Sequence, residues 1–407
     1  MHSRELAYLL AAISNLEQQG HHAIPSPPPG VNPLSARALR RSAVAVVLRV
    51  RPSSSCASPV QSTQCENDTA FDVKQFAEQE WVRSGTPEVL VIKRAVRAGD
   101  RWSGDAAFSG GHSEPSDGGS SAATAERETF EEVGLDLSDR SRYRIIGSLD
   151  DRTMATWFGE FLMVVSAVVY LQIVPDTPPL QLQPSEVQSA HWIPLKALID
   201  AAHPLASFPN SETHLPIDLV RRVTGAMKRF RNPSTATSLM LSCMSNMVGT
   251  VNFPSIHIPV NDDNGNVEPL RLWGMSLGVA MELVERARHA LAHDPSIARF
   301  AASHGVGRVV DGHPWLAGGI WRWAWLDIYL MVKIGVFMSR SLGLYSDPNL
   351  LLQQRAPWSQ IAAAKRSKVL VYRTAIRTAI ALSLIGKSIA AFWLGKTALQ
   401  ACIRARY

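Results

Sequence analysis

The chain has 407 residues, of which 46% are hydrophobic and 19% are charged. These proportions exclude a wholly disordered protein, and the length is sufficient for two or three domains with a sizeable core. The net charge of +6 is spread unevenly. From His313 to Tyr407, thirteen Lys or Arg stand against Asp327 and Asp347, so this tail carries +11 and the remainder −5. The asymmetry indicates that the tail meets an anionic partner, either a membrane surface or a nucleic acid.

The N-terminal segment, residues 1–20, is predicted to form a short helix. It contains Glu5 and Glu17 and lacks the charged and then apolar layout of a secretory signal. The four cysteines form no CxxC pair, which fits a reduced compartment and a fold without a disulfide frame. The sequence therefore favours an intracellular protein, and both mitochondrion and peroxisome stay open as its compartment.

Proline-rich residues 23–34 are expected to be a linker, so that residues 1–34 form an N-terminal extension. Strands and helices then mix up to about residue 295. The expected elements are a strand at 42–50, a helix at 71–85, a strand at 88–96, a helix ending at Val133, strands at 143–149 and 160–174, a loop, short strand and helix within 183–202, a less regular stretch at 200–250, a strand at 253–260, a turn at 261–266 and a helix at 270–291.

The stretch RETFEEVG, residues 127–134, lies in an expected helix and carries an unusual density of negative charge. Ser120 or Ser121 is expected to cap this helix at its N-terminus, and Gly134 is expected to end it. Like charges at spacings of three and four residues cost about 0.2–0.5 kcal/mol per pair, so they need a counter-charge. On a 3.6-residue period one face gathers three glutamates: Glu128, Glu131 and Glu132.

Two neighbouring features favour a binding site around these carboxylates. Arg127 offers a positive charge through its i+4 relation to Glu131, and carboxylate oxygens are the ligands that Mg²⁺ and Mn²⁺ prefer. Upstream, Gly110 and Gly111 let backbone groups approach an anionic ligand closely. The alternative is a glutamate-rich helix face that is only solvated. The length of the joint pattern favours a diphosphate-and-metal site.

This joint pattern resembles the Nudix box, G-x5-E-x7-R-E-U-x-E-E-x-G-U, in which U is apolar. Asp117 stands where the first glutamate belongs, and two more residues than in the pattern separate it from Arg127. Thr129 stands at the first U, and Ser109 stands where a proline is common before the two glycines. The matching residues are Gly111, Arg127, Glu128, Glu131, Glu132, Gly134 and Leu135.

The resemblance implies an α/β fold, namely the Nudix α/β/α sandwich around a mixed β-sheet. It implies hydrolysis of the diphosphate of a nucleoside-diphosphate derivative with Mg²⁺ or Mn²⁺ as the cofactor. By this resemblance, the glutamates at 128, 131 and 132 hold the metal ions, and the carbonyl of Gly110 completes a metal shell. Glu128 is the expected base, and Arg127 is expected to orient the glutamates.

The resemblance extends beyond the box. Residues 93–111 are similar to a stretch of the Nudix branch that includes the coenzyme A diphosphatases. Residues 184–198 and 270–284 resemble later elements of that branch. The implied Nudix domain covers residues 35–300, with an insertion around 200–250. The implied substrate is coenzyme A or an acyl-coenzyme A, and the coenzyme A products are 4′-phosphopantetheine and adenosine 3′,5′-bisphosphate.

Arginines near a diphosphate site are natural phosphate contacts. Arg94, Arg97 and Arg101 are therefore candidate substrate-binding residues, together with Gly111. The alternative for the arginines is a set of solvated loop charges. Three further polar residues are expected to make structural hydrogen bonds: Asp105, His112 and Glu186. Glu186 is also a minor candidate for an extra carboxylate at the site.

The tail, residues 301–407, is expected to be mainly helical, apolar and basic. It holds six of the eleven tryptophans. Two helices are expected, within 318–345 and 365–399. At about 100° per residue, each helix carries one narrow basic stripe. The stripes consist of Arg322, Lys333 and Arg340 within roughly 20° of each other, and of Arg366, Arg373, Arg377 and Lys387 within roughly 80°.

Three arrangements of the tail fit this pattern. The helices lie on an anionic membrane, or span it, or pack as a buried hairpin on the Nudix domain or a second subunit. Spanning places Lys387 near the centre of the bilayer at a cost of about 2.5–3.5 kcal/mol. Membrane association is favoured over packing, and nucleic acid is not expected because the stripes lack interleaved aromatic residues. The alternative function is therefore a non-catalytic Nudix-fold binding or scaffold protein at a membrane.

Overall fold

The computed structural model of the chain has two compact units, Met1–Thr213 with Ser255–His313 and Pro357–Ser359, and His214–Pro254 with Pro314–Ala356 and Gln360–Tyr407. Most of the predicted linker, the turn at 262–266, Arg101 and Arg322 lie outside the described residues, and the boundaries at residues 34 and 300 stay predictions. The structure describes residues 3–24, 40–53, 72–97, 103–155, 161–201, 214–218, 234–248, 250–261, 267–293, 326–354 and 356–404.

The first unit is built on a mixed β-sheet. Its central strand β1 pairs antiparallel with β2 and β4 and parallel with β6. The order along the sheet is β5-β6-β1-β2-β3-β10-β9, with β7 on the other edge of β2. The strands are β1 Arg41–Arg51, β2 Thr86–Arg94, β3 Ala106–Ala107, β4 Ser109–His112, β5 Tyr143–Ala155, β6 Phe161–Gln172, β7 Val187–Pro194, β9 Thr250–Asn261 and β10 Val267–Trp273.

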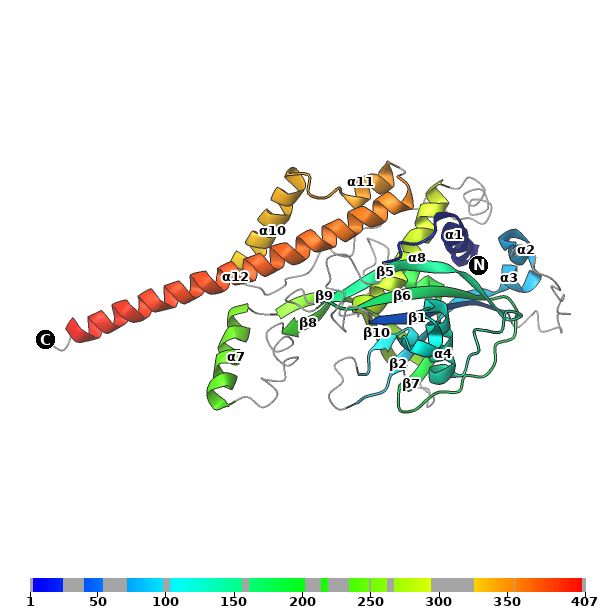
Figure 1. Ribbon diagram of the computed structural model, residues 1–407, viewed down its shortest axis with the longest axis horizontal. Coiled ribbons are helices and arrows are strands. Elements are labelled where there is room, and N and C mark those ends of the chain that lie inside the picture. The colour runs from blue at the N-terminus through cyan, green and yellow to red at the C-terminus, as the bar shows by residue number, and fades with distance from the viewer. Residues whose placement is uncertain are drawn as a thin grey trace. The chain divides into compact units, whose positions relative to one another are not determined.

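Helices cover both faces of this sheet (Figure 1). Alternate residues of a strand point to opposite faces, and seven of the eleven residues of β1 are buried, on both faces, which requires cover on both sides. Ala43, Ala45 and Val47 pack into the core beneath α4 (Ser121–Val133). The opposite face is covered by α1, α5 and α8, which confirms the predicted α/β/α sandwich. These helices are α1 Ser3–Gln19, α5 Leu195–Ala201 and α8 Gly274–His293.

A fully buried arginine ties α1 to α8. The guanidinium of Arg286 on α8 forms an ion pair with Asp150 of β5 at 3.0 Å and with Glu282 at 3.1 Å. It also donates a hydrogen bond to the carbonyl of Gly20 at 2.8 Å, just beyond α1. The same group lies over the ring of Trp358 at 4.8 Å. A buried charge is tolerated only when paired in this way, so α1 is an integral part of the fold.

Two of the predicted elements were wrong in detail. The helix expected at 71–85 is two short helices, α2 Val73–Glu78 and α3 Glu80–Ser84, because Gln79 adopts an extended conformation between them. The helix expected at 270–291 begins only at Gly274. Leu270 and Leu272 alternate with the less buried Arg271, which is the period of a strand, and β10 takes these residues.

The second unit contains the strand β8 and the first five residues of β9, and is otherwise helical in its described part. This confirms the expected helical, apolar and basic C-terminal region. Between Trp358 and Thr397, helix α12 is long and apolar enough to cross a membrane, judged by length and composition alone. Of its most apolar 18-residue stretch, 12% is buried. The elements are β8 His214–Asp218, α7 Thr235–Val248, α10 Leu326–Ser341, α11 Pro348–Gln353 and α12 Trp358–Arg404.

Candidate active site

The helix that carries the glutamates begins and ends where the sequence predicts. Ser120 is the N-cap of α4, and its hydroxyl accepts a hydrogen bond from the backbone N–H of Ala123 at 3.2 Å. Gly134 closes the helix in a left-handed conformation with a φ of 73°. This helix packs against β4 and β1, which brings its glutamates to the Gly110–Gly111 backbone.

Two of the three predicted metal ligands turn toward that backbone. Glu132 is buried, and its carboxylate accepts a hydrogen bond from the N–H of Gly110 at 2.9 Å. The carboxyl group of Glu128 lies so close to Gly111 that a Cβ there would stand 2.4 Å from Glu128 Cδ. A side chain at position 111 would therefore displace this glutamate. The predicted role of the Gly110 carbonyl stays a prediction, because the contact seen is made by its N–H.

The third predicted ligand points elsewhere. The side chain of Glu131 is 56% exposed and lies 3.3 Å from Arg127. Within the described ranges, no group of three His, Cys, Asp or Glu side chains is already arranged to hold a metal ion. The buried Glu132 and the half-buried Glu128 are thus the core of the candidate site, and Glu131 borders it through Arg127.

Arg127 connects the glutamate helix to the loop before it. Its guanidinium lies 3.1 Å from Glu128 and 3.3 Å from Glu131. It also donates a hydrogen bond to the carbonyl of His112 at 2.8 Å. On its remaining edge it forms an ion pair with the buried Asp117 at 3.0 Å. Held on four sides, Arg127 has the geometry to orient the two adjacent glutamates.

Asp117, which stands at the first glutamate of the Nudix pattern, is anchored by this arginine. The hydrogen bond from Arg127 lowers the pKa of Asp117 to about 2. Its carboxylate also accepts hydrogen bonds from the Glu114 N–H at 2.9 Å and the Thr124 hydroxyl at 2.8 Å. Between Asp117 and the helix cap, two consecutive glycines with φ values of 58° and 78° turn the chain sharply: Gly118 and Gly119. The lengthened segment therefore still places an acid against the arginine.

Burial disfavours the charged forms of Glu128 and Glu132. It raises the pKa of Glu132 to about 8, and the nearby Glu128 carboxylate adds to the effect. Burial also raises the pKa of Glu128, against the opposing influence of Arg127. Two crowded carboxylates that lack enough positive charge are a donor set suited to a hard divalent cation, whose charge would relieve both. The residues present therefore fit Mg²⁺ or Mn²⁺.

The candidate substrate arginines lie beside this pair. Arg94, at the end of β2, is near enough to Glu132 to lower its pKa. Arg97 forms an ion pair with Glu186 at 2.9 Å and donates a hydrogen bond to the Ser185 carbonyl at 2.5 Å. The Glu186 carboxylate also raises the pKa of both site glutamates, so this minor candidate of the sequence does border the site.

The two other polar residues near the site have structural partners, as the sequence suggested. Asp105 is buried and forms an ion pair with Arg271 at 2.5 Å, which joins β3 to β10. His112 Nδ1 lies 2.8 Å from the hydroxyl of Ser42, across the β1–β4 pair.

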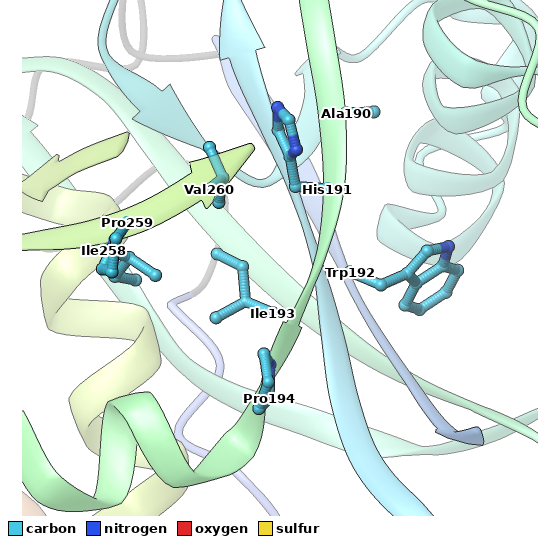
Figure 2. A pocket seen from close by; sticks show the side chains of 8 residues that line it. All are labelled: Ala190, His191, Trp192, Ile193, Pro194, Ile258, Pro259 and Val260. Carbon is cyan, nitrogen blue, oxygen red and sulfur yellow. The ribbon is translucent and has the colours of Figure 1, made fainter. Parts of the chain in front are cut away.

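A separate pocket of about 320 Å³ lies between β7 and β9. Figure 2 shows His191 and Ile193 directed into it, with Ala190 and Trp192 on the opposite side of the strand. None of the predicted site residues lines this pocket. Its lining is Ala190, His191, Trp192, Ile193, Pro194, Ile258, Pro259 and Val260.

Comparison with known proteins identifies the domain that holds the glutamate helix. Residues 81–213 match the model of the NUDIX domain. An uncharacterized protein of Schizosaccharomyces pombe is 33% identical over 223 residues, which are 54% of this chain and 56% of that protein. The chain thus spans about half the length of this curated relative.

Two solved structures are also similar. The NUDIX domain of Shewanella oneidensis NrtR, complexed with ADP ribose, is 14% identical with a TM-score of 0.25, covering 41% of this chain and 80% of that one. A NUDIX hydrolase from Alicyclobacillus acidocaldarius is 19% identical with a TM-score of 0.24, covering 39% of this chain and 81% of that one. Over residues 81–213, which hold the glutamate helix, this chain is therefore similar to the NUDIX domain.

Proposed function

We propose that the chain is a metal-dependent Nudix hydrolase that cleaves the diphosphate of a nucleoside-diphosphate derivative. The observation that carries the proposal is the placement of Glu128 and Glu132 against the Gly110–Gly111 backbone, with Arg127 bound beside them. Both carboxyl groups have raised pKa values because they are buried near each other. Such pairs are common at sites that bind metal ions or move protons.

The metal would be held by Glu128 and Glu132, with Glu131 and the Gly110 carbonyl as the further ligands proposed from the resemblance. Mg²⁺ or Mn²⁺ would supply positive charge that offsets both the carboxylates and the diphosphate. Glu128 is the proposed base, because its raised pKa suits it to accept a proton from the attacking water. Arg127 holds this carboxylate in place from 3.1 Å away.

The proposed substrate contacts come from the neighbouring loop. Arg94 and Arg97 would bind phosphate oxygens. Arg94 lies near Glu132, and Arg97 lies beside Glu186, which neighbours the glutamate pair. Arg97 would have to exchange its ion pair with Glu186 for the phosphate. Gly111 is the further proposed substrate contact, since a glycine lets backbone groups approach an anionic ligand, and the Glu128 carboxyl group lies beside it.

The proposed substrate is coenzyme A or an acyl-coenzyme A, and the similarity of residues 93–111 to the coenzyme A diphosphatase branch supports it. ADP-ribose belongs in the same test, since the NUDIX domain of NrtR is complexed with it. We further propose an intracellular location, which fits the absence of a CxxC pair among the four cysteines.

A non-catalytic binding or scaffold protein at a membrane is the second candidate. It is favoured by the position of Glu131, which faces Arg127 and solvent and leaves only two glutamates against the glycine backbone. A protein of this kind would bind a nucleoside diphosphate without cleaving it.

The test separates the two candidates. The purified full chain is incubated with Mg²⁺ or Mn²⁺ and a panel of coenzyme A, acyl-coenzyme A, NADH, ADP-ribose and dinucleoside polyphosphates. Products are followed by ³¹P NMR, and ¹⁸O-labelled water shows which phosphorus is attacked. We expect turnover that Glu128→Gln or Glu132→Gln lowers at least about 100-fold, while Glu78→Gln on the remote helix α2 leaves it unchanged. Saturable binding without turnover would instead establish the binding protein.

A further inference from the structure

The end of α12 is a helix without cover in the described part of the structure. Its first half is partly buried: Gly335 of α10 approaches so closely that an added Cβ would stand 3.4 Å from the Cβ of Ala375. Further along the helix, Ile376, Ala379 and Ser383 are also buried. From Ile385 to Thr397, by contrast, none of the described side chains is buried.

This uncovered segment is apolar along one side. At about 100° per residue, five of its large exposed apolar side chains project within a sector about 100° wide, and Leu394 projects on the opposite side. Lys387 points about 170° away from the middle of that sector. Phe392 in this sector is 69% exposed, and a row of exposed apolar side chains marks an interaction surface. The apolar stripe consists of Leu382, Ile385, Ile389, Phe392 and Trp393.

The charge of the helix is of one sign. α12 contains eight Lys or Arg and no Asp or Glu. Arg366, Arg377 and Lys387 project within about 80° on the side away from the apolar stripe. Near the end of the stripe, the ammonium group of Lys396 lies over the ring of Trp393 at 5.0 Å. Tryptophan and lysine are side chains that favour the boundary between lipid and water.

The helix fits an orientation along the bilayer better than across it. Between Arg377 and Lys396, residues 378–395 extend about 27 Å at about 1.5 Å per residue, close to the thickness of a hydrocarbon core. Lys387 would then lie at the bilayer centre, where a charge is costly. Lying flat, the same helix buries its apolar stripe and leaves Lys387 in water.

We propose that residues 378–397 of α12 bind an anionic lipid bilayer as an interfacial amphipathic helix. The apolar stripe enters the lipid, and the basic side chains face the anionic headgroups and the water above them. This inference is independent of the proposed hydrolase activity, because it involves none of the residues around Glu128.

The test is flotation of the full chain with vesicles. Vesicles of phosphatidylcholine with phosphatidylserine are compared with vesicles of phosphatidylcholine alone. We expect roughly tenfold stronger binding to the anionic vesicles and a loss of binding as salt concentration rises. Alkaline carbonate should extract the bound protein, because an interfacial helix does not span.

Matched double variants locate the contact on the helix. Ile389→Glu with Phe392→Glu places two charges in the apolar stripe and should abolish flotation. Ser388→Glu with Leu394→Glu adds the same charge outside the apolar stripe, and this variant should keep most of its flotation. Circular dichroism confirms that both variants are folded.

Four results would overturn the proposal. They are no flotation of the wild-type chain, equal flotation on both kinds of vesicle, equal loss in both double variants, or resistance to carbonate, which would mean a spanning helix. Light scattering tests the alternative that a second copy of the chain covers the apolar stripe. If the wild-type chain is a dimer that does not bind vesicles, and the Ile389→Glu with Phe392→Glu variant alone is a monomer, the apolar stripe binds a second copy of the chain instead.

Discussion

The hydroxyl groups of Ser109 and Thr129 lie 2.9 Å apart in a fully buried environment. Each residue alone departs from the Nudix pattern, Ser109 at the position of a common proline and Thr129 at an apolar position. The hydrogen bond shows that the two departures belong together. It joins β4 to α4 within one residue of the Gly110 and Glu128 positions of the site.

The pair predicts a coupled effect on stability. Thr129→Val should lower the free energy of unfolding by about 1–3 kcal/mol, because it leaves the Ser109 hydroxyl buried without its partner. Adding Ser109→Ala should restore part of that loss. Urea unfolding of the single and double variants measures the coupling. Strictly additive losses would show that the hydrogen bond contributes nothing.

The ion pair of Asp117 with Arg127 predicts an acid-sensitive stability. Because the pKa of Asp117 is lowered to about 2 in the folded chain, its contribution is fully present above its unfolded pKa of about 4. The contribution is lost as the pH falls from about 4 through 2. Asp117→Asn should lower the free energy of unfolding at neutral pH by about 1.5–3 kcal/mol. Its unfolding free energy should also change less between pH 4 and 2 than that of the wild-type chain, and parallel acid profiles would contradict this account.

Metal addition should stabilise the chain through the buried glutamates. A ligand that binds only the folded state raises the melting temperature, so Mn²⁺ should raise it and EDTA should reverse the shift. Since the pKa of Glu132 is raised to about 8 and the metal competes with its proton, binding should strengthen as the pH rises toward and through 8. Differential scanning fluorimetry at several pH values measures both effects. Glu132→Gln should lose the shift and Glu78→Gln should keep it; an unchanged shift in Glu132→Gln would place the metal elsewhere.

Gly111 is predicted to be required for the position of Glu128. In Gly111→Ala the new Cβ would stand 2.4 Å from the Glu128 carboxyl carbon, so the carboxylate must move. A displacement of about 1 Å at a reacting group costs on the order of 100-fold in turnover. The control is Gly386→Ala, where an added Cβ meets no atom within 4 Å. Comparable turnover numbers for the two variants would show that Glu128 does not depend on the bare glycine.

Local patterns predicted the parts of the site that lie on one element. The serine cap, the closing glycine and the common face of the glutamates follow from the period and ends of a single helix. The link from Asp117 to Arg127 could not be predicted, because it depends on the turn through two left-handed glycines. The contact of Arg97 with Glu186 joins positions 89 residues apart, which spacing alone cannot reveal.

The same limit explains the misplaced helix boundary. The run 270–291 contains apolar residues at both strand and helix spacing, so its composition does not decide where one ends and the other begins. Its pairing with β9 and β3 decides it, since backbone hydrogen bonds to those strands fix residues 267–273 as extended. The individual strands were predictable from β-branched runs, but their order in the sheet was not.

The bridge from α1 to Arg286 has a consequence for how the protein is made. Asn15 and Arg286, which share a buried hydrogen bond in this bridge, are 271 residues apart in the chain. At about 5–20 residues per second, the ribosome needs roughly 15 to 55 s to release the second after the first. During that interval, the apolar side of α1 and the sheet face beneath it have no α8 to complete their cover. The nascent chain should therefore be a client for chaperones until α8 has emerged.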